Sequence, residues 1–167
     1  MEKTRSFPAL VTAAAATRKA SPSPKQKEIL VPIDFSEPSL NALRHARELA
    51  AGEKAHLTLV NIIEEPGSFR TLDAVGQRRA RYEQRLDRLQ ELVDRELGSQ
   101  VASRIEVREG NPSVEIARLA SQRQVELIVV GRHQHHWLWQ WVQGHTASTL
   151  SKKAGCPVLL LEPGHRN

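Results

Sequence analysis

The stretch Val125-Glu-Leu-Ile-Val-Val-Gly131 says more about the architecture of this chain than any other. Its run from Leu127 to Val130 is too uniformly apolar for a strand with one face in water, and it suits the buried middle of a parallel sheet that helices cover on both faces. Gly131 ends the run. A glycine after a strand often cradles phosphate, because the backbone comes close and the next helix points free amides at an anion.

Strands and helices are predicted to alternate on both sides of this stretch. Five strands separated by four helical segments, with right-handed crossovers, predict an α/β fold: one doubly wound parallel sheet with helices on both faces. Such sheets bind ligands at the carboxyl ends of their strands. We predict strands at 28–33, 56–63, 104–108, 125–130 and 157–161. Helices are predicted at 36–52, around 82–97, from Pro112 onward and at 146–153. In the helix that starts at Pro112, Val114, Ala117 and Ala120 are expected to face inward.

The chain of 167 residues fits one domain, which we place at 27–163 between a tail at 1–26 and a short end at 164–167. Residues 1–27 hold six basic side chains and one acid, so 28–167 carries 18 of each and is neutral overall. The basic, hydroxyl-rich tail is expected to be disordered, either as an organelle transit peptide, as a non-cleaved extension or as the product of a start codon placed too early.

Three classes of protein are disfavoured by the sequence: membrane-spanning, disulfide-bonded and nucleic-acid-binding proteins. No apolar run approaches the roughly 20 residues that span a bilayer, so we expect no membrane span and a cytoplasmic protein. The single cysteine, Cys156, excludes an internal disulfide and is expected to pack in the core. Nucleic acid is an unexpected partner, because the basic charge lies in a tail that has no aromatic interleaving beyond Phe7.

An ordered series of motifs resembles the universal stress protein family. The series covers 27–162 and consists of Ile29-Leu-Val-Pro-Ile-Asp-Phe-Ser36, Gly110-Asn-Pro112 with Ile116 and Ala120, Leu127-Ile-Val-Val-Gly131, Gly144, and Cys156-Pro-Val-Leu-Leu160. The resemblance implies a Rossmann-like fold, an adenine nucleotide as a regulatory ligand, and a homodimer. The apolar last strand at 157–161 would pair with its counterpart across a two-fold axis, because open sheets must cover their edges.

The same resemblance implies a nucleotide site with an altered phosphate loop. Members that bind ATP have the pattern Gly-x2-Gly-x9-Gly followed by Ser or Thr. Here the spacing is kept, but Gln134 replaces the second glycine and His145 the hydroxyl residue. We therefore expect ATP or AMP to bind weakly, with Mg²⁺ accompanying ATP. The implied nucleotide-binding residues are Pro32, Ile33, Asp34, Val60, Gly131, Gln134, Gly144, His145 and Thr146.

Two of these residues also have structural explanations. Asp34 precedes Ser36 and could satisfy free amides at the start of a helix, as an alternative to contacting the nucleotide. Gly131 could end a buried strand at a point where any side chain would clash. Its retention together with Gly144 favours a ligand role.

The segment between Gly131 and His145 is rich in histidine and tryptophan. His133, His135, His136 and His145 could hold zinc or nickel, but no cysteine or acid joins them, so we predict a surface cluster and no metal site. Trp137 and Trp141 would share one helical face and Trp139 the other. An indole left on the surface marks contact with a protein partner, a ligand base or a membrane interface.

Three functions compete on these grounds. The first is a dimeric nucleotide-binding stress module, and the second is a member of the same family that acts through protein contacts of its Trp137–Trp141 loop. The third is an enzyme, which ranks last because no Ser/His/Asp series, cysteine nucleophile or carboxylate pair has motif spacing. We expect slow ATP hydrolysis at most.

Overall fold

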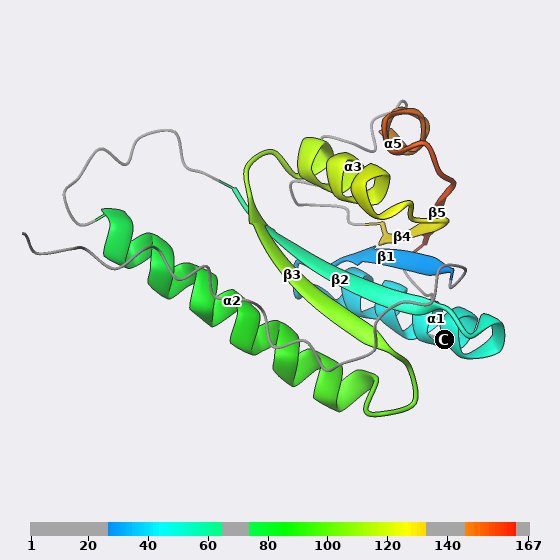
Figure 1. Cartoon of the computed structure of the whole chain (residues 1–167), viewed down its shortest axis with the longest axis horizontal. Helices are drawn as coiled ribbons and strands as arrows, with labels where there is room; N and C mark the ends of the chain where they lie inside the picture. The colour runs from blue at the N-terminus through cyan, green and yellow to red at the C-terminus, as the bar shows by residue number, and fades with distance from the viewer. Residues whose placement is uncertain (1–26, 65–73, 133–145, 163–167) are drawn as a thin grey trace, which may run out of the picture.

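The computed structural model describes residues 27–64, 74–132 and 146–162, and these form five strands and four helices that alternate along the chain (Figure 1). The strands are β1 (Glu28–Pro32), β2 (His56–Ile63), β3 (Ser103–Glu109), β4 (Leu127–Gly131) and β5 (Val158–Leu161). The helices are α1 (Glu37–Glu53), α2 (Ala74–Glu96), α3 (Pro112–Arg123) and α5 (Thr146–Ala154). None of these helices is long and apolar enough to cross a membrane.

The five strands form one sheet in the order β3-β2-β1-β4-β5, and every neighbouring pair is parallel. The first strand of the chain therefore lies at the centre. It pairs with β2 from Glu28 opposite His56 to Pro32 opposite Val60, and with β4 at Ile29 opposite Leu127. The predicted doubly wound parallel α/β fold is confirmed.

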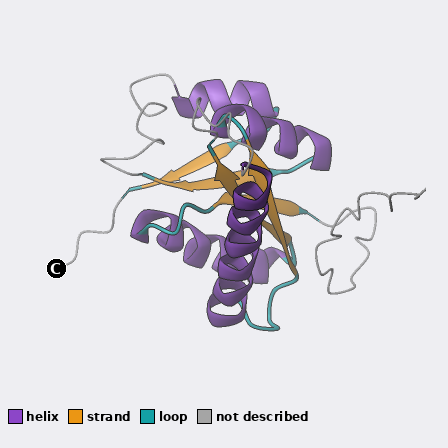
Figure 2. Ribbon diagram, turned by 90° about the vertical axis from the view of Figure 1, so that its left-hand side faces the viewer, coloured by secondary structure: helices purple, strands orange, loops and turns teal. Residues whose placement is uncertain are grey.

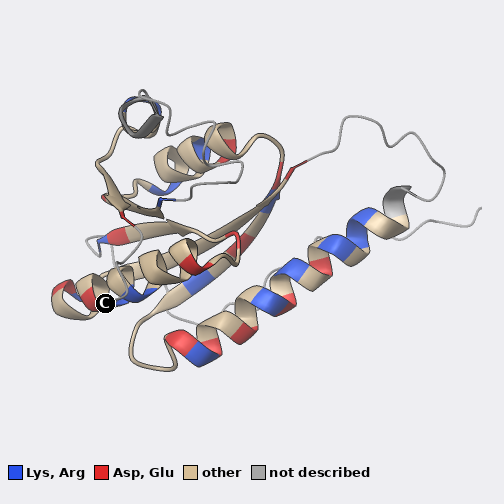
Figure 3. Ribbon diagram, turned by 180° about the vertical axis from the view of Figure 1, so that it is seen from behind, with Lys and Arg blue, Asp and Glu red and all other residues tan. Residues whose placement is uncertain are grey.

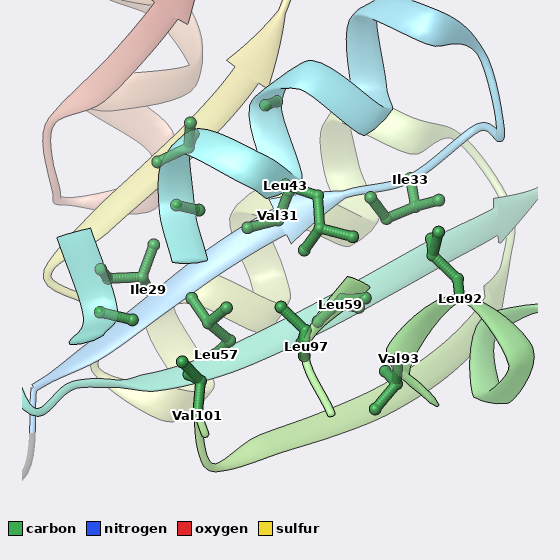
Figure 4. Close-up of a cluster of buried hydrophobic side chains, with 14 of the residues drawn as sticks. Ile29, Val31, Ile33, Leu43, Leu57, Leu59, Leu92, Val93, Leu97 and Val101 are labelled. Atoms are coloured by element: carbon green, nitrogen blue, oxygen red, sulfur yellow. The ribbon is translucent and has the colours of Figure 1, made fainter. Parts of the chain in front are cut away.

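Helices cover both faces of the sheet (Figure 2). The helices α1 and α2 pack on one face, and α3 and α5 pack against each other on the opposite face. Each face has its own apolar core, and Figure 4 shows the one beneath α1 and α2, where Val31 of β1, Leu59 of β2 and Leu43 of α1 meet. Burial of apolar area on two faces is the main stabilising contribution to such a domain.

The strand β4 is apolar throughout because both of its faces are covered. Val129 belongs to the α1/α2 core, whereas Ile128 and Val130 belong to the α3/α5 core. Cys156 also packs in the α3/α5 core, as predicted, and burial raises the pKa of its thiol. A thiol whose pKa is raised is less reactive, because the thiolate is the nucleophile.

The starts of α1 and α3 are capped as their sequences predict. The Ser36 hydroxyl accepts a hydrogen bond from the Ser39 amide at 3.4 Å, and the Asn111 side chain accepts from the amides of Ser113 and Val114. Both helices then have proline in the first turn, where its missing amide costs nothing. These caps fix where the chain leaves β1 and β3.

The prediction is wrong for one core residue. Val114 was expected inward on α3, but it is 50% exposed. The buried residues of this helix are Pro112, Ile116, Ala117, Leu119 and Ala120. They recur at helical spacing, and Val114 lies two residues, about 200°, before Ile116 on the other side of the helix.

The orientation of α3 predicts unequal effects for two substitutions on this helix. Leu119→Ala should lower the free energy of unfolding by about 2–5 kcal/mol, because it opens a cavity in the α3/α5 core. Val114→Ala should change it by no more than about 0.5 kcal/mol, since that side chain lies at the surface. Urea unfolding followed by circular dichroism measures both. Equal losses would contradict the orientation of α3.

Candidate functional site

The candidate site lies at the carboxyl ends of β1 and β4, the two strands between which the strand order reverses. From β1 the chain continues into α1 on one face of the sheet, and β1 has β2 on one side and β4 on the other. Connections that diverge from two adjacent parallel strands leave a crevice between them, and ligands of open α/β sheets bind there.

The turn between β1 and α1 is held by hydrogen bonds of Asp34. Its Oδ1 accepts from the Ser36 amide at 3.0 Å and also from the Ser36 hydroxyl. The Ser36 hydroxyl in turn caps α1. Asp34 therefore does satisfy a free amide at the start of α1, as its structural explanation requires. Asp34 is half-buried, so part of it also faces outward from the end of the sheet.

The residue between them, Phe35, has an unusual backbone conformation. Its φ is 65°, in the left-handed region that bulky side chains rarely adopt. Residues in such conformations persist only where the surrounding structure holds them, and they cluster at functional sites. The sequence did not single out Phe35, because a residue type that rarely adopts a positive φ gives no sign that it does so here.

Three further predicted residues, Pro32, Ile33 and Val60, meet beneath this turn. Pro32 is opposite Val60 in the sheet, and the Ile33 amide donates to the Val60 carbonyl at 2.8 Å. Their side chains are nevertheless divided between the faces, because Ile33 packs in the α1/α2 core and Val60 in the α3/α5 core. Both side chains are fully buried, so they support the turn from within.

Asn61 was missed by the sequence reasoning. It is a buried polar residue in the largely apolar second half of β2, and its Nδ2 donates to the Ile33 carbonyl at 2.7 Å. That bond ties the exit of β1 to β2. A lone asparagine in the run Leu57-Thr-Leu-Val-Asn-Ile-Ile63 was the available signal, because a buried amide needs a partner.

Gly131 lies at the end of β4 directly against the first turn of α1. A Cβ atom at this position would lie 2.0 Å from the Pro38 carbonyl oxygen, which is backbone and cannot move aside easily. Its structural explanation is thus supported. The same contact brings the end of β4 and the start of α1 together, so the backbone of these two segments is closely packed at the candidate site.

The rest of the predicted phosphate loop lies outside the described residues. This applies to Gln134, Gly144 and His145, to the histidines at 133, 135 and 136, and to the three tryptophans. Thr146 begins α5. Within the described ranges, no group of three His, Cys, Asp or Glu side chains is arranged to hold a metal ion.

Comparison with known proteins agrees with this architecture. The universal stress protein family matches residues 26–162. The chain belongs to this family. A universal stress protein of Methanocaldococcus jannaschii is 29% identical over 144 residues, which cover 81% of this chain and 82% of the relative.

Two solved universal stress proteins share the fold. The structure of UspA from Lactobacillus plantarum superposes with a TM-score of 0.62 at 24% identity, over 83% of this chain and 99% of that one. A universal stress protein solved in complex with cAMP superposes with a TM-score of 0.50 at 20% identity, over 81% of this chain and 96% of that one.

The contact at Gly131 predicts a strong effect of the smallest substitution. Gly131→Ala should lower the free energy of unfolding by about 2 kcal/mol or more, because the added methyl group meets the Pro38 backbone. The matched control is Gly52→Ala in α1, where a Cβ has nothing within 4 Å and alanine favours the helix by about 1 kcal/mol. Urea unfolding that ranks the two variants the other way would contradict this packing.

Proposed function

We propose that this universal stress protein is a module that binds an adenine nucleotide at the carboxyl ends of β1 and β4. The observation that carries the proposal is the position of Asp34, which lies half-buried in the β1–α1 turn at the point where the strand order reverses. Family membership and the cAMP complex of a protein with the same fold support it. Asp34 follows the end of β1 and is half-buried there, so it is partly accessible.

The proposed ligand is AMP in preference to ATP. ATP-binding members of the family have a glycine and a hydroxyl residue at two positions of the phosphate loop. In this chain Gln134 and His145 occupy those positions. A bulkier residue keeps backbone amides from the distal phosphates, and each lost amide contact lowers affinity. A monophosphate depends on fewer of these contacts. Mg²⁺ would accompany ATP, because it coordinates phosphate oxygens together with water.

The module acts by binding and not by catalysis in this proposal, and we place it in the cytoplasm. A second candidate function is protein binding through the Trp137–Trp141 segment without a nucleotide. The sequence favours it on one point, because Trp137 and Trp141 would share one helical face and Trp139 would point away, which leaves one indole hard to bury in a monomer.

The role of Asp34 can be separated from its structural role. Asp34→Asn keeps an oxygen that accepts from the Ser36 amide, but it removes the charge that would strengthen a bond to a ribose hydroxyl. We expect AMP affinity to fall about tenfold by titration calorimetry. Asp87→Asn, on the exposed side of α2, should leave it unchanged. Equal affinity of the Asp34 and Asp87 variants would remove Asp34 from the site.

Restoring the glycine pattern tests the weakened phosphate loop. The double variant Gln134→Gly with His145→Ser should bind ATP at least about tenfold more tightly in the presence of Mg²⁺, because additional donors reach the phosphates. If the chain and this variant both fail to bind AMP and ATP, the nucleotide function is wrong. Loss of a cellular partner on Trp139→Ala would then support the protein-binding function.

We also propose that the module is a homodimer joined through β5. The amide of Ile128 donates to the Pro157 carbonyl and that of Arg132 to the Leu161 carbonyl, so alternate residues of β5 bond to β4. The backbone groups of Val158 and Leu160 therefore point away from β4. All four residues of β5 are apolar and only half-buried, which favours a second copy over water.

Blocking that edge should separate the two copies. Leu160→Pro removes an amide that points away from β4, so it should disrupt pairing between copies while leaving the β4–β5 bonds in place. We expect the mass measured by sedimentation to fall to that of one chain, with unchanged helical content by circular dichroism. A variant that stays folded and dimeric would place the interface elsewhere.

A further inference from the structure

Phe35 has a strained backbone conformation that contacts of its side chain help to hold. Its φ is 65°, and it lies between Asp34 and Ser36, which are joined by hydrogen bonds. Its side chain is half-buried and packs against the α1/α2 core. The groups that hold this ring therefore hold the backbone conformation between Asp34 and Ser36.

Two arginines of α2 cover the ring. The Cζ of Arg88 lies 3.9 Å from the ring centroid, and that of Arg85, almost one helical turn earlier, lies 5.7 Å from it. A guanidinium over an aromatic face is attracted by the ring quadrupole. The distance gives Arg88 the larger share. Through Phe35, these two arginines of α2 contact the β1–α1 turn.

The helix that carries the arginines is itself fixed to the domain at both ends. Near its start Arg78 pairs with Glu109 of β3, and at its end Glu96 pairs with Arg44 of α1 at 3.4 Å and accepts from Arg47 at its carbonyl at 2.8 Å. Figure 3 shows that basic and acidic residues are interspersed along α2. Arg95 and Arg44 lower the pKa of Glu96 although burial opposes them. Because α2 is held at both ends, Arg85 and Arg88 have a fixed position over the Phe35 ring.

We propose that Arg88 is a positioning residue for the candidate site, acting through Phe35 on the turn that presents Asp34. Arg88 does not touch the ligand in this account. It stabilises the left-handed conformation of Phe35, which orients the Asp34 carboxylate and its bonds to Ser36. The effect on the ligand rests on the proposed nucleotide function, whereas the effect on the turn does not.

The first test needs no ligand. Amide hydrogen exchange of Ser36 by NMR reports opening of the bond to Asp34. Arg88→Met keeps an unbranched stem and loses the cation, so exchange should be about 2–5 times faster, the usual range for a partly exposed cation–π pair. Arg88→Lys keeps a cation and should restore part of the protection. Arg79→Met, a matched change on the same helix at an arginine that pairs with Glu83, should have no effect.

The second test uses AMP and calorimetry on the same variants. Arg88→Met should weaken binding by the same factor of about 2–5, and Arg79→Met should not. Unchanged Ser36 exchange in Arg88→Met would overturn the positioning role, as would AMP affinity equal to that of the parent chain. If the parent chain does not bind AMP, the proposed function fails, and the exchange series alone decides whether Arg88 positions the turn.

Discussion

The close contact between Gly131 and the Pro38 carbonyl is the constraint on which the candidate site depends. It allows α1 to approach the end of β4 more closely than any side chain would permit. The contact joins two segments that start from adjacent strands, and it sets how the β1–α1 turn faces the end of β4. Asp34 lies in that turn, four residues before Pro38.

The architecture could be predicted because burial on two faces leaves a clear pattern. The run Leu127 to Val130 is apolar at every position since helices cover both sides of β4, and the Asn111-Pro112 and Ser36 signals mark helix starts by local hydrogen bonding. Val114 was misplaced because apolar residues occur at several angles around the start of α3. Only the packed structure shows that Ile116 and Leu119, and not Val114, face the sheet.

The candidate site could be predicted only where its bonds are local in sequence. The bond between Asp34 and Ser36 spans two residues, so an acid before a serine at a helix start suggests it. The bond from Asn61 to Ile33 and the contact of Arg88 with Phe35 join segments that meet only once the sheet and α2 have packed. No spacing rule reveals such pairs. Gln134, Gly144 and His145 remain predictions.

The strand order also bears on how the domain is made. The first three strands are neighbours in the five-stranded sheet, with β1 at their open side, and they can pair while the rest of the chain is still being synthesised. The partner on that open side, β4, follows only near the end of the domain, so its pairing with β1 has a large sequence separation and is expected to be slow. Until then β1 presents an unpaired apolar edge, the kind of surface that chaperones shield and that aggregates form from. The crevice at the strand ends is consequently among the last parts of the protein to exist, and an incomplete chain has a sheet before it has a site.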